Sequence, residues 1–379
     1  MARVLHVVGD SKFGGASVLI GRLAQAAQAQ KYEVDVLTTN KTFAQHLRNE
    51  GVGVVDLDVA RRAIRPARDL SDVRKLKSFL NSRKYTVVHT HTSKGGLVGR
   101  LAAWSAHVPV VVHTVHGFAI HEGSSLAATR AYASLETIAA TRCHRVVTVS
   151  EFHRDWAIRL GIAAADKIVA IPNGIDPRRV AYPGTKAEAR SELGLNQATP
   201  LVVNAGRLAP QKGLSDLLAA MTEVNARTGA RLILAGDGPM REQLEEEARA
   251  LGISEAVDFL GFRSDVGRLL RASDVVVLPS IREGLSIALL EAMAAGKPIV
   301  ATAIGSNIEV TGDGTCADLV EVNAIGQIAE ATVGLLRDAE RAEELGALAL
   351  ARFNSSYQEE TMLRAYMELY REPYDFRLH

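Results

Sequence analysis

The stretch Leu201-Val-Val-Asn-Ala-Gly-Arg-Leu-Ala-Pro-Gln-Lys-Gly213 decides the fold of this chain. It starts as a short apolar run, ends in a loop with glycine and proline, and leads into a helical pattern near 213–227. Apolar runs that alternate with amphipathic segments are typical of a parallel sheet with crossover helices. The alternation continues with strand patterns at 231–235, 257–260, 275–278 and 298–301. The second half of the chain therefore predicts a doubly wound α/β unit.

The first half of the chain repeats this alternation. Its strand patterns lie at 4–8, 34–37, 52–57, 86–90, 108–112, 145–149 and 167–171. We expect two Rossmann-like domains, 1–172 and 200–355, joined by a polar linker, 173–199, and followed by a helix within 356–379 that packs back on the first domain. Open sheets of this kind bind ligands at the carboxyl ends of their strands, so two facing domains would place a site in the cleft between them.

Composition narrows the class of protein. A chain of 379 residues is long enough for two domains, and 47% hydrophobic residues is ordinary for a globular protein. An aromatic content of 5% does not favour a base-stacking nucleic-acid surface, so no nucleic-acid partner is expected. The sequence shows no targeting segment and no apolar run of ~18–20 residues that would span a membrane. Two cysteines make no disulfide framework, and we expect a cytoplasmic protein.

The net charge of +1 hides an asymmetry between the two halves. Residues 1–180 carry 25 Lys/Arg and 14 Asp/Glu, whereas the rest carry 19 and 29. The basic excess is largest in 61–100. Such a surface suits an anionic partner, either a membrane surface that the protein binds peripherally or a phosphorylated acceptor. A solvated basic face without a partner is the alternative.

The segment Arg282-Glu-Gly-Leu-Ser-Ile-Ala-Leu-Leu-Glu-Ala-Met293 carries the clearest chemistry. A strand pattern precedes it, and a helix is expected to begin near Ser286. The backbone N–H groups of Gly284, Leu285 and Ser286 would then lie at a helix N-terminus, where a diphosphate is favoured. Glu283 and Glu291 are eight residues apart, about 12 Å on a helix, and two carboxylates at that spacing can hold the ribose and the sugar of one nucleotide-sugar.

A second candidate element follows the strand at 201–205. The loop Gly206-Arg-Leu-Ala-Pro-Gln-Lys-Gly213 places Arg207 and Lys212 five residues apart. Two cations in one βα loop can converge on a diphosphate and neutralise the charge that develops on a leaving nucleotide. Two exposed loop cations without a ligand are the alternative for this element alone.

These motifs, in this order, resemble the retaining glycosyltransferases of family GT4. The resemblance rests on Glu-x7-Glu and Gly-Arg-Leu-x-Pro-x-Lys-Gly, together with Ala-Gly-Asp-Gly-Pro (235–239), Phe-Leu-Gly-Phe (259–262) and Pro-Asn-Gly-Ile-Asp (172–176). It implies the GT-B fold, with two Rossmann-like domains facing across a cleft. It also implies a nucleotide-sugar donor, with UDP expected, that is bound by the second domain.

The resemblance implies a role for individual residues. Arg207 and Lys212 would contact the donor diphosphate, and Glu291 the ribose. Glu283 and the backbone of 284–286 would hold the transferred sugar and the distal phosphate. The backbone of Phe262 and Arg263 would receive the base, and Asp237-Gly-Pro239 would be a structural turn. No cofactor is implied, because the nucleotide-sugar is a substrate and no Asp-x-Asp metal motif is present.

The first half supplies the expected acceptor side. Gly15, in the paired glycines of the first βα turn, resembles a loop that closes over the donor in GT4 enzymes. Histidines gather at two strand ends, in His89-Thr-His-Thr-Ser-Lys94 and in His113-Thr-Val-His-Gly-Phe118, with His121 after them. A metal site would also want carboxylates, so none is predicted. His116 resembles the histidine that faces the transferred sugar, and His91, Ser93 and Lys94 are candidates for acceptor contacts.

The resulting hypothesis is a metal-independent, retaining transferase in cell-surface polysaccharide or lipid-linked oligosaccharide synthesis. Its catalytic residues would be Glu283, His116, Arg207 and Lys212, and its acceptor a sugar or a polyprenyl-diphosphate-linked sugar. Three alternatives stay open: a nucleotide-sugar epimerase on the same fold, a GT4 enzyme with a soluble small-molecule acceptor, and a binding protein without turnover.

Overall fold

A computed structural model describes residues 2–10, 14–61, 65–120 and 124–372 of the chain. The chain divides into two compact units. Unit 1 comprises residues 1–173 together with the tail from Thr361, and unit 2 comprises Gly174–Glu360. No helix in the described part of the chain is long and apolar enough to cross a membrane.

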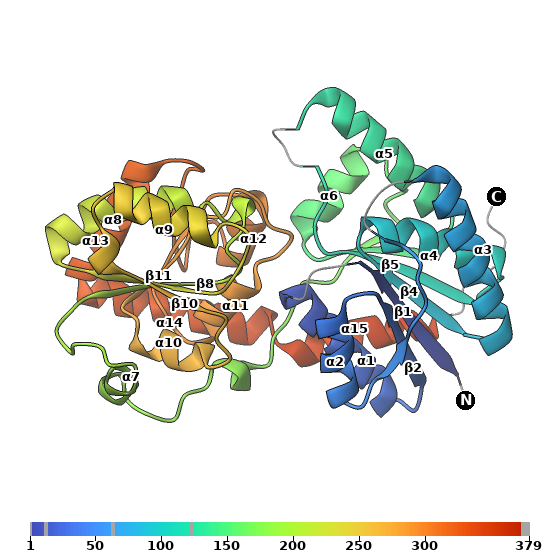
Figure 1. The fold of residues 1–379 in the computed structure, drawn as a ribbon, viewed down its shortest axis with the longest axis horizontal. Helices are drawn as coiled ribbons and strands as arrows, with labels where there is room; N and C mark the ends of the chain where they lie inside the picture. Colours follow the sequence, from blue (N-terminus) through green and yellow to red (C-terminus); the bar gives the residue numbers. More distant parts are fainter. Residues whose placement is uncertain (1, 11–13, 62–64, 121–123, 373–379) are drawn as a thin grey trace. The chain divides into compact units, whose positions relative to one another are not determined.

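Unit 1 is built on a parallel seven-stranded sheet in the order β3-β2-β1-β4-β5-β6-β7. Helices cover both faces of this sheet (Figure 1), with α1, α2 and α15 on one side and α3, α4 and α5 on the other. Its elements are β1 (Arg3–Gly9), α1 (Gly15–Ala29), β2 (Glu33–Thr38), α2 (Lys41–Asn49), β3 (Gly53–Val55), α3 (Pro66–Arg83), β4 (Val87–His91), α4 (Ser93–Ser105), β5 (Val110–Val115), α5 (Leu126–Ala140), β6 (Arg145–Thr148), α6 (Glu151–Arg159), β7 (Ile168–Ala170) and the returning α15 (Glu359–Arg371).

Helix α4 lies unusually close to the sheet of unit 1. A Cβ atom at Gly96 would be 2.4 Å from the ring of His113 on β5, and one at Gly99 would be 2.6 Å from Thr90 on β4. Small residues at these positions therefore allow the helix to pack directly over polar side chains near the strand ends. The remaining contacts of that face are apolar and include Val88, Val111 and Val146.

Helix α15 packs on the opposite face of the same sheet. Tyr366 and Tyr370 of this helix are almost fully buried. The hydroxyl of Tyr370 lies 2.6 Å from Nδ1 of His89, and the hydroxyl of Tyr366 accepts a hydrogen bond of 3.2 Å from Thr114. Helix α15 is therefore part of the core of unit 1.

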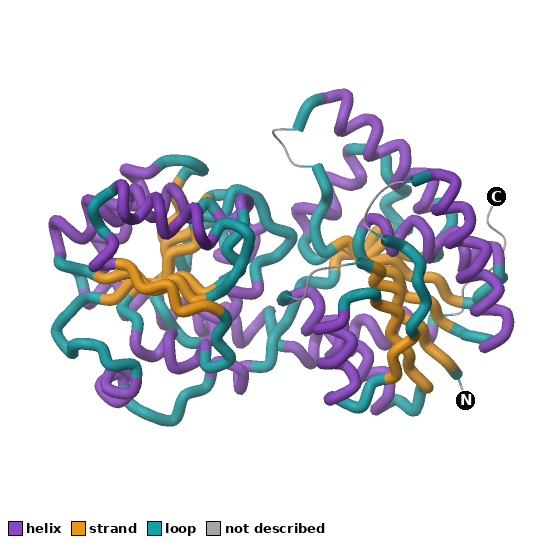
Figure 2. Tube along the Cα trace, in the orientation of Figure 1, coloured by secondary structure: helices purple, strands orange, loops and turns teal. Residues whose placement is uncertain are grey.

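Unit 2 is built on a parallel six-stranded sheet in the order β10-β9-β8-β11-β12-β13. Figure 2 shows this sheet as a layer between helices. Its elements are η1 (Pro177–Val180), α7 (Lys186–Glu192), β8 (Leu201–Ala205), η2 (Pro210–Lys212), α8 (Leu214–Thr228), β9 (Arg231–Ala235), α9 (Arg241–Ala250), η3 (Ser254–Ala256), β10 (Val257–Gly261), α10 (Val266–Ala272), β11 (Val275–Leu278), α11 (Ile287–Ala294), β12 (Ile299–Thr302), α12 (Gly305–Thr311), β13 (Asp318–Val320), α13 (Ile325–Arg337) and α14 (Ala339–Ser356).

The predicted fold class, two doubly wound α/β sheets, is confirmed. The predicted linker 173–199 differs from the structure, because almost all of it belongs to unit 2. Helix α7 begins with a capping box between Thr185 and Glu188, and Ala189 is fully buried in the core of this unit. Arg190 is also buried and pairs with Asp274 at 2.6 Å. The segment 173–199 is polar because α7 turns few side chains into the core, and so few apolar residues give only a weak helical pattern.

Two loops of unit 2 meet backbone to backbone. Gly213 has a φ of 62°, and a Cβ atom there would lie 2.0 Å from the carbonyl oxygen of Pro279. The amide of Ile281 donates a hydrogen bond of 2.8 Å to the carbonyl of Gln211. The loop after β8 and the loop after β11 are therefore joined directly, and only glycine satisfies both the backbone angle and the space at 213.

A matched pair of glycine substitutions tests this contact. Gly213 and Gly229 both have positive φ, but a Cβ atom at Gly229 meets nothing within 4 Å. We expect Gly229→Ala to cost about 1–2 kcal/mol of stability from the backbone angle alone. Gly213→Ala should cost at least about 2 kcal/mol more, because the carbonyl of Pro279 must also move.

Hydrogen exchange of the β8 and β11 amides measures this difference within unit 2. Tryptophan fluorescence would not serve, since Trp104 and Trp156 both lie in unit 1. Equal exchange rates in the two variants would mean that the loop contact contributes nothing to stability.

Candidate functional site

The candidate donor site lies where the strand order of unit 2 changes direction. β8 and β11 are neighbours at the centre of the sheet, while β9 and β10 extend to one side and β12 and β13 to the other. At such a switch point the loops after the two central strands diverge and leave room for a ligand. The two sequence motifs, 206–213 and 283–291, follow these two strands.

A lysine and a glutamate from the two loops form an ion pair at this point. Nζ of Lys212 contacts Oε1 of Glu283, and both side chains are mostly buried. Ser280 donates a hydrogen bond of 2.8 Å to the same carboxylate oxygen. The side chain of Ser306 donates to the backbone carbonyl of Glu283 at 3.4 Å. Two of the predicted catalytic residues are thus brought together and held in place.

Glu291 lies on α11 with its side chain 13% exposed. Arg179, from η1, approaches its carboxylate at 3.4 Å. Burial raises the pKa of Glu291, and the nearby cations Arg179 and Lys212 oppose this shift. A carboxylate in this setting is well suited to accept hydrogen bonds from ligand hydroxyls, because it has little competing water.

The N-terminus of α11 begins as the sequence predicts. Ser286 is the N-cap residue, and its side chain accepts a hydrogen bond of 3.4 Å from the amide of Leu289. Leu285 and Ser286 are nearly buried, with 5% and 4% exposure. Gly284, Leu285 and Ser286 therefore form a compact turn between Glu283 and the helix, where the helix dipole favours an anion.

The loop that carries Arg207 packs backbone to backbone against a second glycine-rich turn, at 236–238. Cβ atoms at Gly236 and Gly238 would lie 1.8 Å and 2.1 Å from the carbonyl oxygens of Gly206 and Leu208. The amide of Leu208 also donates a hydrogen bond of 3.0 Å to the carbonyl of Asp237. The segment 235–239 thus has the structural role that the sequence predicts, and Leu208 is fully buried while Arg207 stays partly exposed.

Phe262 and Arg263 follow β10, which is two strands away from β8. The side chain of Phe262 is 74% exposed. The guanidinium of Arg263 forms a two-pronged ion pair with Asp265, at 2.7 Å and 2.6 Å. The Arg263 side chain is therefore held in an ion pair with Asp265. This leaves only its backbone for the predicted contact with the base.

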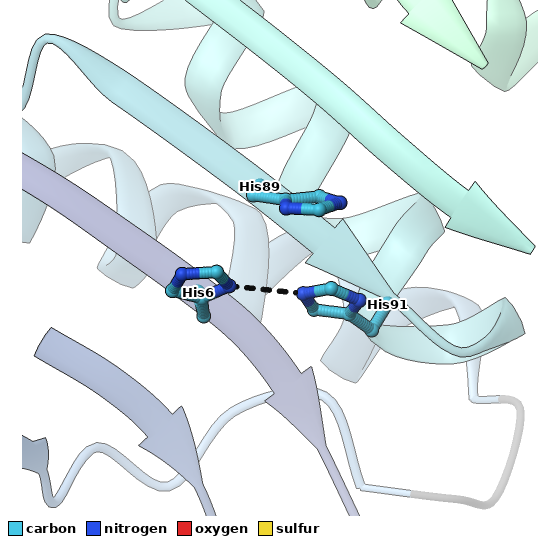
Figure 3. A group of neighbouring side chains, drawn as sticks. All are labelled: His6, His89 and His91. Atoms are coloured by element: carbon cyan, nitrogen blue, oxygen red, sulfur yellow. Dashed lines mark hydrogen bonds between the residues drawn. The ribbon is translucent and has the colours of Figure 1, made fainter. Parts of the chain in front are cut away.

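Unit 1 contains a histidine cluster made by His6 in the middle of β1, His89 and His91 of β4, and His116 in the turn after β5. Figure 3 shows His6 of β1 beside His89 and His91 of β4. Nδ1 of His6 lies 3.1 Å from Nε2 of His91, and Nδ1 of His91 lies 3.1 Å from Nε2 of His116. The predicted sugar-facing residue, His116, is therefore linked to two buried histidines.

The trio of His6, His89 and His91 has ring nitrogens close enough together to be considered as a metal site. However, both nitrogens of His89 are already in short hydrogen bonds, at 2.6 Å to Tyr370 and 2.7 Å to Thr114. A metal ion would have to break one of them, and the trio includes no carboxylate to balance its charge. A hydrogen-bonded network accounts for these residues better than a metal centre does.

The histidines of this cluster are neutral at physiological pH. Burial lowers the pKa of His6 to about 3 and that of His116 to about 4. Burial, followed by the neighbouring histidines, lowers the pKa of His89 and His91 well below the usual value. The cluster therefore offers hydrogen-bond donors and acceptors but no charge.

The other residues of the first half that the sequence predicts as ligand contacts lie outside the histidine cluster. Gly15 is the first residue of α1 and is exposed. Ser93 is hydrogen-bonded to Tyr132, and Lys94 forms an ion pair with Asp69, so both have partners within unit 1. His121 and the residues before Gly14, at 11–13, lie outside the described residues.

Sequence reasoning missed several residues of these two sites. Arg179 falls within the predicted linker, although the pair of arginines after Asp176 is a charge signal next to a turn motif. His6 belongs to no predicted site, although a histidine inside the apolar run 4–8 is unusual. Nothing local could have identified Tyr370, because its contact with His89 spans 281 positions in the sequence.

Both halves of the chain match models of glycosyltransferase domains. Residues 14–174 match the model of a "Glycosyl transferase 4-like domain", and residues 185–351 match "Glycosyl transferases group 1". The Escherichia coli UDP-Gal:alpha-D-GlcNAc-diphosphoundecaprenol alpha-1,3-galactosyltransferase is 32% identical over 282 residues, 73% of each chain. The alpha-maltose-1-phosphate synthase of Mycolicibacterium smegmatis is 29% identical and covers 95% of this chain and 96% of its own.

Solved structures agree on the fold. Anabaena Alr3699/HepE in complex with UDP has a TM-score of 0.82 and 24% identity, with coverage of 97% of this chain and 99% of its own. WaaG, a glycosyltransferase involved in lipopolysaccharide biosynthesis, has a TM-score of 0.77 and 18% identity, with coverage of 98% and 100%. These relatives do not favour the epimerase alternative, and the chain belongs to the GT4 family of glycosyltransferases with the GT-B fold.

Proposed function

We propose that this enzyme transfers a sugar from a UDP-sugar to a lipid-linked acceptor with retention of configuration. The observation that carries the proposal is the preassembled group of Lys212, Glu283 and Glu291 at the switch point of unit 2. The E. coli relative, whose name gives UDP-Gal as donor and a diphosphoundecaprenol-linked acceptor, supports both substrate classes.

In the proposed mechanism the donor diphosphate lies between the loop 206–213 and the N-terminus of α11. Lys212 and Arg207 neutralise the charge that develops as the bond between the anomeric carbon and the phosphate oxygen breaks. The acceptor oxygen forms its new bond on the same face, and the leaving phosphate takes the acceptor proton. The chain therefore needs no protein nucleophile, and its contribution is positioning and charge stabilisation.

Within this scheme Glu283 holds hydroxyls of the transferred sugar and Glu291 those of the ribose. The ion pair with Lys212 fits this role, because the same lysine can then reach both the carboxylate and a phosphate oxygen. The backbone of 284–286 binds the distal phosphate, that of 262–263 binds the base, and Gly15 closes over the donor.

A panel of nucleotide-sugars tests the proposed donor. We expect UDP, and not GDP or ADP, to raise the unfolding temperature, since a ligand that binds only the native state stabilises it. With a membrane-lipid extract as acceptor, one UDP-sugar should be turned over with its anomeric configuration retained, and EDTA should not abolish the reaction. A soluble inositol phosphate or sugar phosphate in place of the lipid tests the alternative acceptor class.

Three outcomes of this panel would contradict the proposed function. Turnover of a soluble acceptor alone would overturn the lipid-linked proposal. Protection by UDP without transfer to either acceptor would support a binding protein instead. Protection by no nucleotide would contradict the donor site itself.

A substitution of Lys212 tests the donor site directly. We expect Lys212→Ala to lower kcat by about 10²–10³-fold, because a preorganised charge at the leaving group is lost. Lys186→Ala is the matched control: Lys186 also pairs with a carboxylate of unit 2, Asp274, but lies outside the site. Its kcat should stay at the wild-type value, and a Lys212→Ala enzyme with the same kcat would remove Lys212 from the site.

Helix α5 of unit 1 supports peripheral contact with an anionic membrane. Leu126, Leu135 and Ile138 on this helix are 64%, 52% and 57% exposed. The one acid of α5, Glu136, is buried in an ion pair with Arg100, so its exposed charge is cationic. An apolar helix face beside the exposed Arg130 suits the interface of an anionic bilayer.

The basic region 61–100 is partly neutralised. Arg61, Arg68, Lys94 and Arg100 have acidic partners, whereas Arg74, Lys75 and Lys77 are exposed.

Vesicle sedimentation tests this surface. The protein should bind vesicles of phosphatidylglycerol and phosphatidylcholine more tightly than vesicles of phosphatidylcholine alone. The double variant Leu135→Gln/Ile138→Gln should weaken binding by about tenfold or more, since each side chain loses on the order of 1 kcal/mol of transfer free energy. Leu251→Gln, at a 40% exposed leucine of unit 2, is the control. Equal binding of all three proteins would exclude α5 as the contact.

A further inference from the structure

The short helix η1 is held in unit 2 by backbone contacts at both of its ends. Just before it, the amide of Ile175 donates a hydrogen bond of 3.1 Å to the carbonyl of Tyr357, and the amide of Glu359 donates one of 3.2 Å to the carbonyl of Ile175. Val180, the last residue of η1, is buried, and a Cβ atom at Gly267 of α10 would lie 2.7 Å from its backbone. The side chains of η1 therefore start from a well-defined backbone.

Two neighbouring arginines of η1 pair with different acids. Arg178 forms an ion pair of 2.6 Å with Asp176, and its side chain is 84% exposed. Arg179 instead reaches Glu291 on α11, with its Nη2 atom 3.4 Å from Oε1, and its side chain is 32% exposed. Because they are adjacent and alike in charge, and differ in whether they face the donor-site carboxylate, the two arginines form a matched pair for experiments.

The surroundings of Glu291 disfavour its negative charge. Its side chain is 13% exposed, and burial raises its pKa. Helix α11 carries no other charged residue, and the charged groups around it that oppose this shift are Arg179 of η1 and Lys212 of η2. Lys212, however, is in direct contact with Glu283. In the described part of the chain, Arg179 is therefore the cation that pairs with Glu291.

The charge of Glu291 decides what it can offer a ligand. An ionised carboxylate accepts hydrogen bonds at both oxygens, whereas a protonated one has an O–H donor in place of part of that capacity. Hydrogen bonds to an ionised acceptor are also stronger than those between neutral groups. A ribose presents two hydroxyl donors on adjacent carbons, so it is matched by the ionised form.

We propose that Arg179 is a positioning residue that keeps Glu291 ionised and oriented as the acceptor for the ribose hydroxyls of the donor. Arg179 then acts through Glu291 and need not touch the nucleotide itself. The ribose contact rests on the proposed function, whereas the effect of Arg179 on the charge of Glu291 is a property of unit 2 alone.

Two nucleotides that differ only in the ribose test this role. UDP has both ribose hydroxyls and 2′,3′-dideoxy-UDP has neither, so the ratio of their Kd values, measured by calorimetry, reports the hydroxyl contacts. We expect the wild-type protein to bind UDP about tenfold more tightly. In Arg179→Leu the Kd for UDP should rise about fivefold or more, while that for the dideoxy nucleotide should stay within about twofold of the wild-type value.

The neighbouring arginine supplies the control. Arg178→Leu should keep both wild-type Kd values, and Arg179→Lys should restore most of the preference for UDP because it returns the positive charge. Equal weakening of both nucleotides in Arg179→Leu would mean that Arg179 contacts another part of the nucleotide, and would overturn the positioning role. A wild-type preference for UDP in Arg179→Leu would overturn it as well.

The pH dependence of binding has a defined sign. Without Arg179 the pKa of Glu291 should rise further, since Lys212 alone then opposes the effect of burial. The preference of Arg179→Leu for UDP should therefore increase as the pH rises through this higher pKa and the carboxyl ionises. The double variant Arg179→Leu/Glu291→Gln should lack this response, and a response that persists in it would contradict the proposal.

Carbon NMR of protein labelled at the glutamate carboxyl carbons measures the charge of Glu291 without any nucleotide. The Glu291 signal, assigned from the spectrum of Glu291→Gln, should titrate at higher pH in Arg179→Leu than in the wild type or in Arg178→Leu. An unchanged titration in Arg179→Leu would overturn the proposal. If the wild-type protein binds neither nucleotide, the proposed donor site fails, and this titration alone decides whether Arg179 keeps Glu291 ionised.

Discussion

The close approach of Gly213 to the carbonyl of Pro279 is the constraint on which the candidate donor site depends. It brings the loops after β8 and β11 into direct backbone contact. Lys212 and Glu283 are 71 positions apart in the sequence, and they meet because this contact fixes where each loop turns. Gly236 and Gly238 act in the same way beneath the loop of Arg207. The positions of the charged side chains therefore depend on close backbone contacts that a Cβ atom at any of these glycines would prevent.

The two candidate sites use different polar groups. The donor site of unit 2 pairs opposite charges, as in Lys212 with Glu283 and Arg179 with Glu291. The histidine cluster of unit 1 consists of buried rings that stay neutral, although Arg100 and Glu136 form a buried ion pair elsewhere in this unit. The difference fits the proposed ligands: a diphosphate needs cations, whereas sugar hydroxyls need only uncharged donors and acceptors, which cost less to bury.

Much of this organisation could be predicted from the sequence. The alternation of strands and helices identified both sheets, and the Glu-x7-Glu and 206–213 motifs identified loops that the structure joins. Local signals were sufficient there, because each motif directly follows a strand. Short elements are harder to predict from the sequence. The apolar patterns of the three-residue strand β13 and of the helices α2 and α12 are too brief to distinguish from loops.

The features that could not be predicted are contacts between distant parts of the chain. Arg179 reaches Glu291 across 112 positions, and Tyr370 reaches His89 across 281. Helix α15 fills the face of unit 1 opposite α4, so its tyrosines complete a network whose other members lie near the start of the chain. A tail that reads as a simple amphipathic helix thereby becomes part of the histidine network. Its buried hydroxyls are constrained by His89 and Thr114, so this helix cannot be exchanged for another of equal hydrophobicity without leaving buried polar atoms unpaired.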